Sequence, residues 1–159
     1  MIEELTLHML AEMCAWRKRW AQDGLRIKVP VNVSAQNLTG PEVADRYEEV
    51  VRSHGLRPED MVLEITESSV MSDTERGLAM LARLRLKGFG LSVDDFGAGY
   101  SSLAQLSQIP FTERKIDRGF VHRAPEQPRK FAMIETSLDL ARKLGLKVVA
   151  EGIETMEEW

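Results

Sequence analysis

The sequence predicts an α/β fold in which parallel strands, joined by helices, form part of a TIM-type (βα) barrel. Segments with apolar residues at every second position alternate with segments whose apolar residues recur every three or four positions, which indicates helical crossovers between parallel strands. Each strand segment ends near a polar residue that points away from its main apolar face. That pattern favours a barrel, because the strands of a doubly wound sheet are apolar on both faces.

The chain opens with a helix and then a strand. Apolar residues at steps of three and four predict a helix over Ile2–Trp20, and we expect Trp16 and Trp20 to pack in the core. Apolar and polar residues then alternate over Ile27–Ser34, which predicts a strand with one apolar face. Pro30 lacks an amide hydrogen, so we expect this strand to lie at an edge or to be irregular there.

The next three elements are a helix, a strand and a second helix. Thr39 and Pro41 begin the first of these helices, and Gly55 is its expected C-terminal cap. The strand is Met61–Thr66, in which Glu64 lies on the face opposite Met61, Leu63 and Ile65. Ser72 and Glu75 have the spacing of a capping box, which predicts a helix from there to Gly88.

A third strand, Gly90–Asp95, leads into the most informative stretch of the chain. Asp94 and Asp95 end this apolar run, and a loop with two glycines and two hydroxyls follows. Adjacent carboxylates repel one another unless a cation or hydrogen-bond donors offset their charge. The stretch therefore indicates a metal or phosphate site, with an ordinary Asp-Gly turn as the alternative.

The remaining elements continue the alternation. A short helix is expected over Ser101–Gln108, ending before Pro110, and a fourth strand over Glu113–Asp117, with Lys115 on the face opposite Arg114 and Ile116. Two prolines then predict a surface loop. A final helix from about Arg129 to Leu144 is capped by Gly145, and a fifth strand over Lys147–Glu151 follows.

Composition restricts the classes of function. The chain has 159 residues, 43% of them hydrophobic, enough for the core of one domain. A net charge of −4 argues against a nucleic-acid polymer as partner. Cys14 is the single cysteine and is expected to be a buried thiol, and neither a signal peptide nor a membrane segment is predicted. A soluble protein in a reducing, cytoplasmic setting is expected.

Five polar residues are predicted to gather at the C-terminal ends of the strands. They are Asn32, Glu64, Asp94, Lys115 and Glu151. Together with Asp95, the four of them other than Lys115 offer oxygen ligands and no cysteine or histidine, which suits Mg²⁺ or Mn²⁺, with Ca²⁺ as an inhibitory substitute. Two such ions could bind the oxygens of a phosphodiester and activate a water. Lys115 could orient that water or stabilise the negative charge that develops on the phosphoryl group.

Each of these residues also has a structural interpretation. Glu64 could be a barrel-interior acid paired with Lys115, Asn32 a strand-end cap, and Glu151 a turn former before Gly152. Histidines 8, 54 and 122 are interpreted as surface residues. A different barrel enzyme that abstracts protons with strand-end acids and a lysine, as enolases do, is a further alternative, although the glycine loop argues against it.

The sequence resembles the EAL domain family in order and spacing over nearly the whole chain. The matching segments are Asn32-Val33-Ser34, Leu63-Glu64-Ile65-Thr66-Glu67-Ser68, Asp94-Asp95-Phe96-Gly97-Ala98-Gly99-Tyr100-Ser101-Ser102-Leu103, Lys115-Ile116-Asp117 and Val149-Ala150-Glu151-Gly152-Ile153-Glu154-Thr155. The resemblance implies a bacterial phosphodiesterase that linearises cyclic di-GMP on a modified TIM barrel. A receptor or interaction module of the same family that does not cleave the nucleotide is the alternative.

The resemblance also implies roles for individual residues. Five would be metal ligands, namely Asn32, Glu64, Asp94, Asp95 and Glu151. Lys115 would be the catalytic lysine, with Glu151 the second residue expected to act in catalysis. Glu67 would anchor the loop Asp95–Ser102, which in the family forms part of a dimer surface, and Glu154 would be a structural acid.

The same comparison leads us to expect an incomplete domain over residues 1–159. The Glu-Ala-Leu signature strand would precede the first helix and a final strand would follow Trp159, so about five of eight strands are expected. The chain would be a truncated product, part of a longer protein, or a fragment completed by another copy. A homodimer, and fusion to sensory or diguanylate cyclase-like domains, are also expected from the resemblance.

Overall fold

The computed structural model describes residues 2–34, 40, 42–66, 74–94 and 109–159. Its five strands are β1 (Val29–Asn32), β2 (Met61–Thr66), β3 (Gly90–Asp94), β4 (Glu113–Ile116) and β5 (Lys147–Ala150). Its α-helices are α1 (Ile2–Gln22), α2 (Glu42–Ser53), α4 (Thr74–Leu86), α6 (Arg118–Val121) and α7 (Pro128–Leu144). Two short 3₁₀ turns, η2 (Pro58–Asp60) and η3 (Ala124–Glu126), lie between them.

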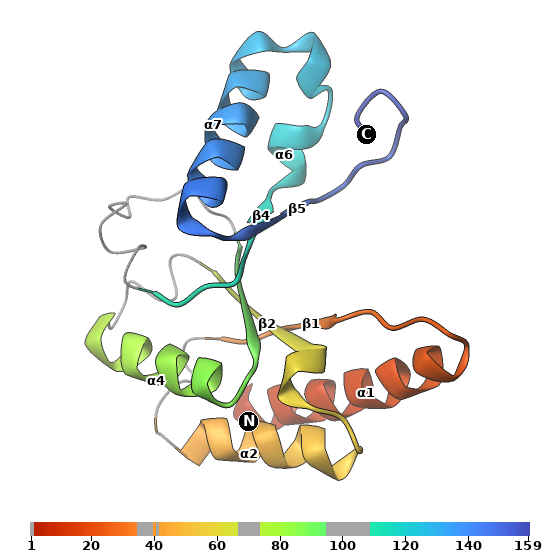
Figure 1. The fold of residues 1–159 in the computed structure, drawn as a ribbon, viewed down its shortest axis with the longest axis vertical. Helices are drawn as coiled ribbons and strands as arrows, with labels where there is room; N and C mark the ends of the chain where they lie inside the picture. The colour runs from red at the N-terminus through yellow and green to blue at the C-terminus, as the bar shows by residue number, and fades with distance from the viewer. Residues whose placement is uncertain (1, 35–39, 41, 67–73, 95–108) are drawn as a thin grey trace.

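The five strands form one parallel sheet in chain order, β1-β2-β3-β4-β5. A doubly wound sheet would reverse direction at a switch point, and this order has no such reversal among the described strands. The expected α/β class is therefore confirmed, as a partial barrel of TIM type. Figure 1 shows the strands running through the middle of the molecule, with β1 and β5 at the two edges of the described sheet.

The helices pack on the apolar face of the sheet. Helices α1, α2 and α4 lie together beside β1 to β3, while α6 and α7 accompany β4 and β5 (Figure 1). The core combines strand residues such as Val31, Leu63 and Leu91 with helix residues such as Tyr47 and Leu84, all at most 2% exposed. Burial of this face against the helices leaves the alternate strand residues on the other face, where the polar groups were expected.

Helix α1 forms as expected but turns a different face to the core. Leu10 and Cys14 are fully buried, and Thr6 and Arg17 are also buried on this face. Trp16, which we expected in the core, is 43% exposed, whereas Trp20 packs at the margin of the core. That expectation was wrong for Trp16, because Arg17 takes an inward position and its guanidinium reaches Asp60 at 3.3 Å.

The other element boundaries follow the sequence with small differences. The predicted strand 27–34 is shortened to β1, in which Pro30 lies on an edge as expected. Gly55 and Gly145 adopt left-handed conformations, φ +73° and +68°, at the ends of α2 and α7. The predicted loop before α7 contains α6 and η3. Three predicted features lie outside the described residues. They are the helix 101–108, the start of the second helix at 39–41 except for Gly40, and Ser72 of the predicted capping box.

Within the described part of the chain, no helix combines the length and the apolar character needed to cross a membrane.

Candidate functional site

The strand register places polar residues from all five strands side by side. Backbone pairing aligns one residue from each strand across the sheet, namely Asn32, Glu64, Ser92, Glu113 and Lys147. Two residues further along β3 and β4 come Asp94 and Lys115, and Glu151 follows β5 directly. Because side chains alternate between faces, residues on these levels point to the face opposite the helices.

Lys115 on β4 connects Glu64 of β2 and Asp94 of β3 with Glu151, which follows β5. Its Nζ atom lies 3.0 Å from Glu64 Oε1, 2.5 Å from Glu151 Oε1 and 3.9 Å from Asp94 Oδ2. The side chains of Lys115 and Glu64 are 10% and 8% exposed, whereas that of Glu151 is 35% exposed. The pairing of Glu64 with Lys115, one of the two interpretations drawn from the sequence, is thus present.

The cluster has a surplus of negative charge. Three carboxylates around one ammonium leave a formal charge of −2. Burial raises the pKa of Glu64, although the ion pair with Lys115 acts in the opposite direction. Burial lowers the pKa of Lys115, but its hydrogen bonds to Glu151 and Glu64 outweigh this effect and raise the pKa above its ordinary value. Lys115 is therefore charged at neutral pH, and an added cation would offset the remaining negative charge.

The other residues expected at the site have different positions. Asn32 aligns with Glu64 across β1 and β2 and is solvent-exposed. Asp95 and Glu67 lie outside the described residues. His8 and His122 are exposed and His54 is partly buried on α2's C-terminal side, where its ring bonds Val50 O. The structure therefore brings Glu64, Asp94, Lys115 and Glu151 together, with Asn32 beside them.

The fit of a metal ion can be judged from the donors that are described. Among these residues, no three histidine, cysteine, aspartate or glutamate side chains are grouped closely enough to hold an ion as they stand. Lys115 lies between the acids instead, at the distances given above. Oxygen donors and surplus negative charge fit a hard divalent cation such as Mg²⁺ or Mn²⁺ rather than a softer one.

Ser92 is a feature of this face that the motifs did not single out. It aligns with Glu64 on the neighbouring strand and is fully buried. Its Oγ atom has no hydrogen-bond partner within the described structure. The alternation of Ser92 with Asp94 places both on one face, and this was the signal in the sequence that could have identified it.

A cavity of about 290 Å³ lies on the opposite face of the sheet. It is lined by residues of β4, α6 and α7 that include Arg114, Ile116, Phe120 and Met133. Arg114 donates to Ser137 Oγ at 3.1 Å across this space. Since the cavity is on the helix-covered side, it is separate from the cluster around Lys115.

The segments that follow β4 and β5 also contact one another. Arg118 pairs with Glu154 at 2.8 Å, and His122 contacts Glu158 at 3.0 Å. Glu154 was expected to be structural, and this ion pair is consistent with that role. His122 is a surface residue as expected, but its link to Glu158 was not anticipated, because residues so far apart in the chain carry no local pattern.

Comparison with known proteins gives a consistent result. The family model described as "EAL domain" matches residues 1–159. A curated relative from Pseudomonas aeruginosa, cyclic di-GMP phosphodiesterase RocR, is 37% identical over 158 residues. The match covers 99% of this chain but 40% of RocR, so the chain spans less than half the length of that relative.

Two of the similar solved structures are complexes with cyclic di-GMP. One is the PaMucR phosphodiesterase in complex with c-di-GMP, with a TM-score of 0.87 and 36% identity, covering 98% of this chain and 63% of that one. Another is Klebsiella pneumoniae BlrP1 with manganese and cyclic di-GMP, with a TM-score of 0.88 and 29% identity, covering 99% of this chain and 40% of that one.

Proposed function

Because the chain belongs to the EAL domain family, we propose that it hydrolyses cyclic di-GMP to linear di-GMP with the help of divalent metal ions. The observation that carries the proposal is the cluster in which Lys115 contacts Glu64, Asp94 and Glu151 at the strand ends. Similarity to RocR, a cyclic di-GMP phosphodiesterase, supports the choice of substrate. Membership of this family also removes the enolase-like alternative.

Five residues would hold the metal ions in this proposal. They are Asn32, Glu64, Asp94, Asp95 and Glu151. Bound Mg²⁺ or Mn²⁺, in a two-ion site, would polarise the phosphodiester and lower the pKa of a water. The manganese in the BlrP1 complex supports the choice of a hard divalent ion.

Lys115 would act directly on the reacting group. Its raised pKa keeps the ammonium protonated at neutral pH, so it donates hydrogen bonds and does not serve as a base. A fixed ammonium at this position stabilises the negative charge that develops on the phosphoryl oxygens. Glu64 and Glu151 hold Lys115 in place from two sides, which reduces the reorganisation required during the reaction.

The proposal is tested by incubating the purified protein with cyclic di-GMP and Mg²⁺ or Mn²⁺, with linear product separated by chromatography. Glu64→Gln keeps the shape of the side chain but removes its charge. We expect this change to lower turnover by at least about 100-fold, because loss of even an outer partner of a metal site costs about 10- to 100-fold and Glu64 would be a direct ligand. Glu49→Gln, at an exposed position of α2, is the control and should retain wild-type turnover.

Two results would contradict the proposal. Turnover that survives in Glu64→Gln would remove Glu64 from the reaction. The folded wild type could instead bind cyclic di-GMP tightly in calorimetry and yield no product in chromatography. That result would support a receptor that does not cleave its ligand. The homodimer, the loop-anchoring role of Glu67, the incomplete extent of the domain and fusion to sensory domains stay predictions.

A further inference from the structure

The Glu158 carboxylate accepts hydrogen bonds from donors in two segments of the chain. Its side chain is 4% exposed. Oε1 accepts from Arg123 N at 3.1 Å and lies 3.0 Å from His122 Nδ1, while Oε2 accepts from Glu154 N at 3.0 Å. The backbone N–H groups of Glu154 and Arg123 hold the pKa of Glu158 below its usual value. Both oxygens of the ionised Glu158 carboxylate thus accept hydrogen bonds.

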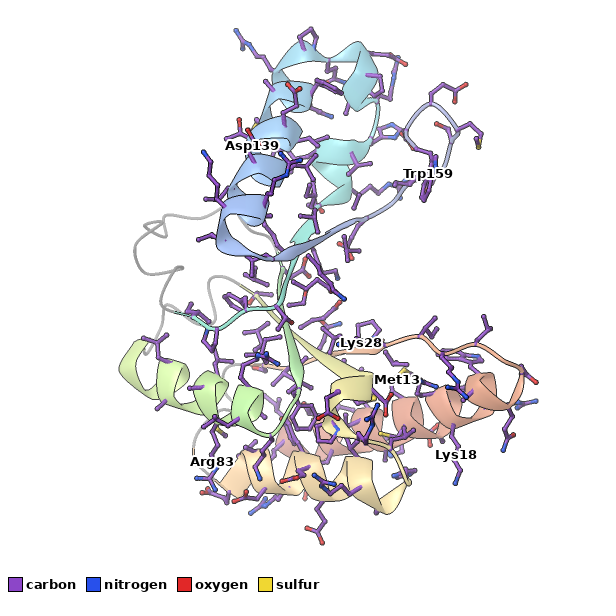
Figure 2. All side chains as sticks on the ribbon, viewed as in Figure 1. Met13, Lys18, Lys28, Arg83, Asp139 and Trp159 are labelled. Carbon is purple, nitrogen blue, oxygen red and sulfur yellow. The ribbon has the colours of Figure 1, made fainter. Side chains whose placement is uncertain are left out.

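The two segments that Glu158 joins begin at the candidate site. His122 and Arg123 belong to the segment after β4, the strand that carries Lys115. Glu154 belongs to the segment after β5, and this segment starts with Glu151. In Figure 2 the end of the second segment, at the labelled Trp159, lies beside α6. Glu158 therefore connects the chain beyond Lys115 to the chain beyond Glu151.

Two further contacts join the same segments closer to the site. Arg118 pairs with Glu154 at 2.8 Å, and Glu151 N donates to Ile116 O at 3.0 Å. Gly152 has φ +68°, and a Cβ atom there would come within 2.5 Å of the Arg118 side chain. Arg118 and Glu154 are more than half exposed, so their ion pair alone fixes little. The Glu158 side chain, in contrast to those of Arg118 and Glu154, is little exposed.

We propose that Glu158 is a positioning residue that fixes Glu151 relative to Lys115 by joining the segments after β4 and β5. The inference rests on the proposed function for its effect on turnover. Glu151 is 35% exposed and follows the last residue of an edge strand, so within the described sheet its backbone is paired on one side, in addition to the ion pair of its side chain with Lys115. Contacts at Glu158 supply a further restraint from the other end of the loop.

The test compares Glu158→Gln with Glu157→Gln, its exposed neighbour. A glutamine amide has one acceptor oxygen, so in either orientation its NH₂ group faces a donor that the carboxylate now satisfies. Amide hydrogen exchange of the metal-free protein is measured at Glu151, Arg123 and Glu154. We expect faster exchange at all three in Glu158→Gln and no change in Glu157→Gln.

Turnover of cyclic di-GMP supplies the second measurement. We expect kcat to fall about 10-fold in Glu158→Gln, as for other residues that orient a metal ligand, with KM changed by less than about 2-fold. A residue that only stabilised the fold would not alter kcat of the folded fraction. His122→Ala removes a single side-chain donor and should shift both measurements in the same direction by a smaller amount, which keeps the test valid if Glu158→Gln does not fold.

The outcomes separate this inference from the proposed function. Unchanged exchange at the Glu151 amide in both Glu158→Gln and His122→Ala would overturn the positioning role, whatever the activity of these variants. Faster exchange with wild-type kcat would also overturn it. Absence of turnover in the wild type would contradict the proposed function alone, and the exchange data would still decide whether Glu158 restrains Glu151.

Discussion

Lys115 is an internal counterion for two carboxylates on strands and for Glu151, which follows β5. It is buried with Glu64, and its ammonium is the charge that these acids share in the described structure. Removal of one partner from a buried ion pair leaves the other charge uncompensated, which costs more than the pair itself contributes. The metal-free fold should therefore depend on Lys115 before any question of catalysis arises.

Lys115→Met keeps the aliphatic part of the side chain and removes its charge. We expect the free energy of unfolding of the metal-free protein, measured in urea, to fall by about 3 kcal/mol. Saturating Mn²⁺ should then stabilise the variant more than the wild type, since a cation would replace the missing charge. Lys143→Met, at an exposed position of α7, should change stability by less than about 0.5 kcal/mol. Equal stability of Lys115→Met and wild type would contradict this role.

Cys14 was expected to be a buried thiol, and the structure confirms it. Burial, with a smaller contribution from Asp60, raises its pKa from 9.0 to about 11. The thiolate is the reactive form, so two pKa units lower its population about 100-fold at neutral pH. Modification by a disulfide reagent at pH 8 should be at least about 100-fold slower in the native protein than in urea. Comparable rates would show that Cys14 is accessible.

The pH dependence of stability from Cys14 has a defined sign. The thiol in the unfolded chain ionises near pH 9, whereas in the folded protein it keeps its proton to about pH 11. Between these values the folded state binds more protons, so the free energy of unfolding should decrease as pH rises. Cys14→Ser should reduce this decrease, as measured by urea unfolding between pH 8 and pH 11.

Among the elements, α1 shows where a pattern of apolar residues was insufficient. Its steps of three and four residues correctly predicted a helix, but two apolar stripes lie on it, and the periodicity does not identify the inner one. Leu10 and Cys14 pack against the sheet, while Leu5 and Trp16 are 58% and 43% exposed. The ion pair of Arg17 with Asp60, which precedes β2, fixes the rotation of the helix and has no local signal in the sequence.

Two leucines of α1 test this orientation. Leu10→Ala removes a fully buried side chain and should lower the free energy of unfolding by about 3 kcal/mol. Leu5→Ala makes the same chemical change on the exposed face and should cost less than about 0.5 kcal/mol. Urea unfolding of both variants provides the measurement. Similar losses from the two changes would mean that both faces of α1 are packed.

For the whole molecule, local patterns were sufficient to predict the order of the sheet. Alternating residues placed Glu64, Asp94 and Lys115 on one face, and strand–helix alternation implied parallel neighbours, so the cluster could be expected from sequence. The sequence offered the pairing of Glu64 with Lys115 as one alternative, but it did not predict that Lys115 would also contact Asp94 and Glu151, or that Glu158 would join two loops. Such contacts depend on side-chain rotamers and on distant segments, which periodicity does not describe.

The strand order also has a consequence for synthesis of the protein on the ribosome. The cluster takes Glu64 from β2, Asp94 from β3 and Lys115 from β4, and its last member, Glu151, comes directly after β5. A nascent chain that has emerged only as far as Lys115 can pair the earlier acids with the lysine but lacks the fourth residue. Translation through β5 therefore sets the earliest moment at which the complete cluster can assemble.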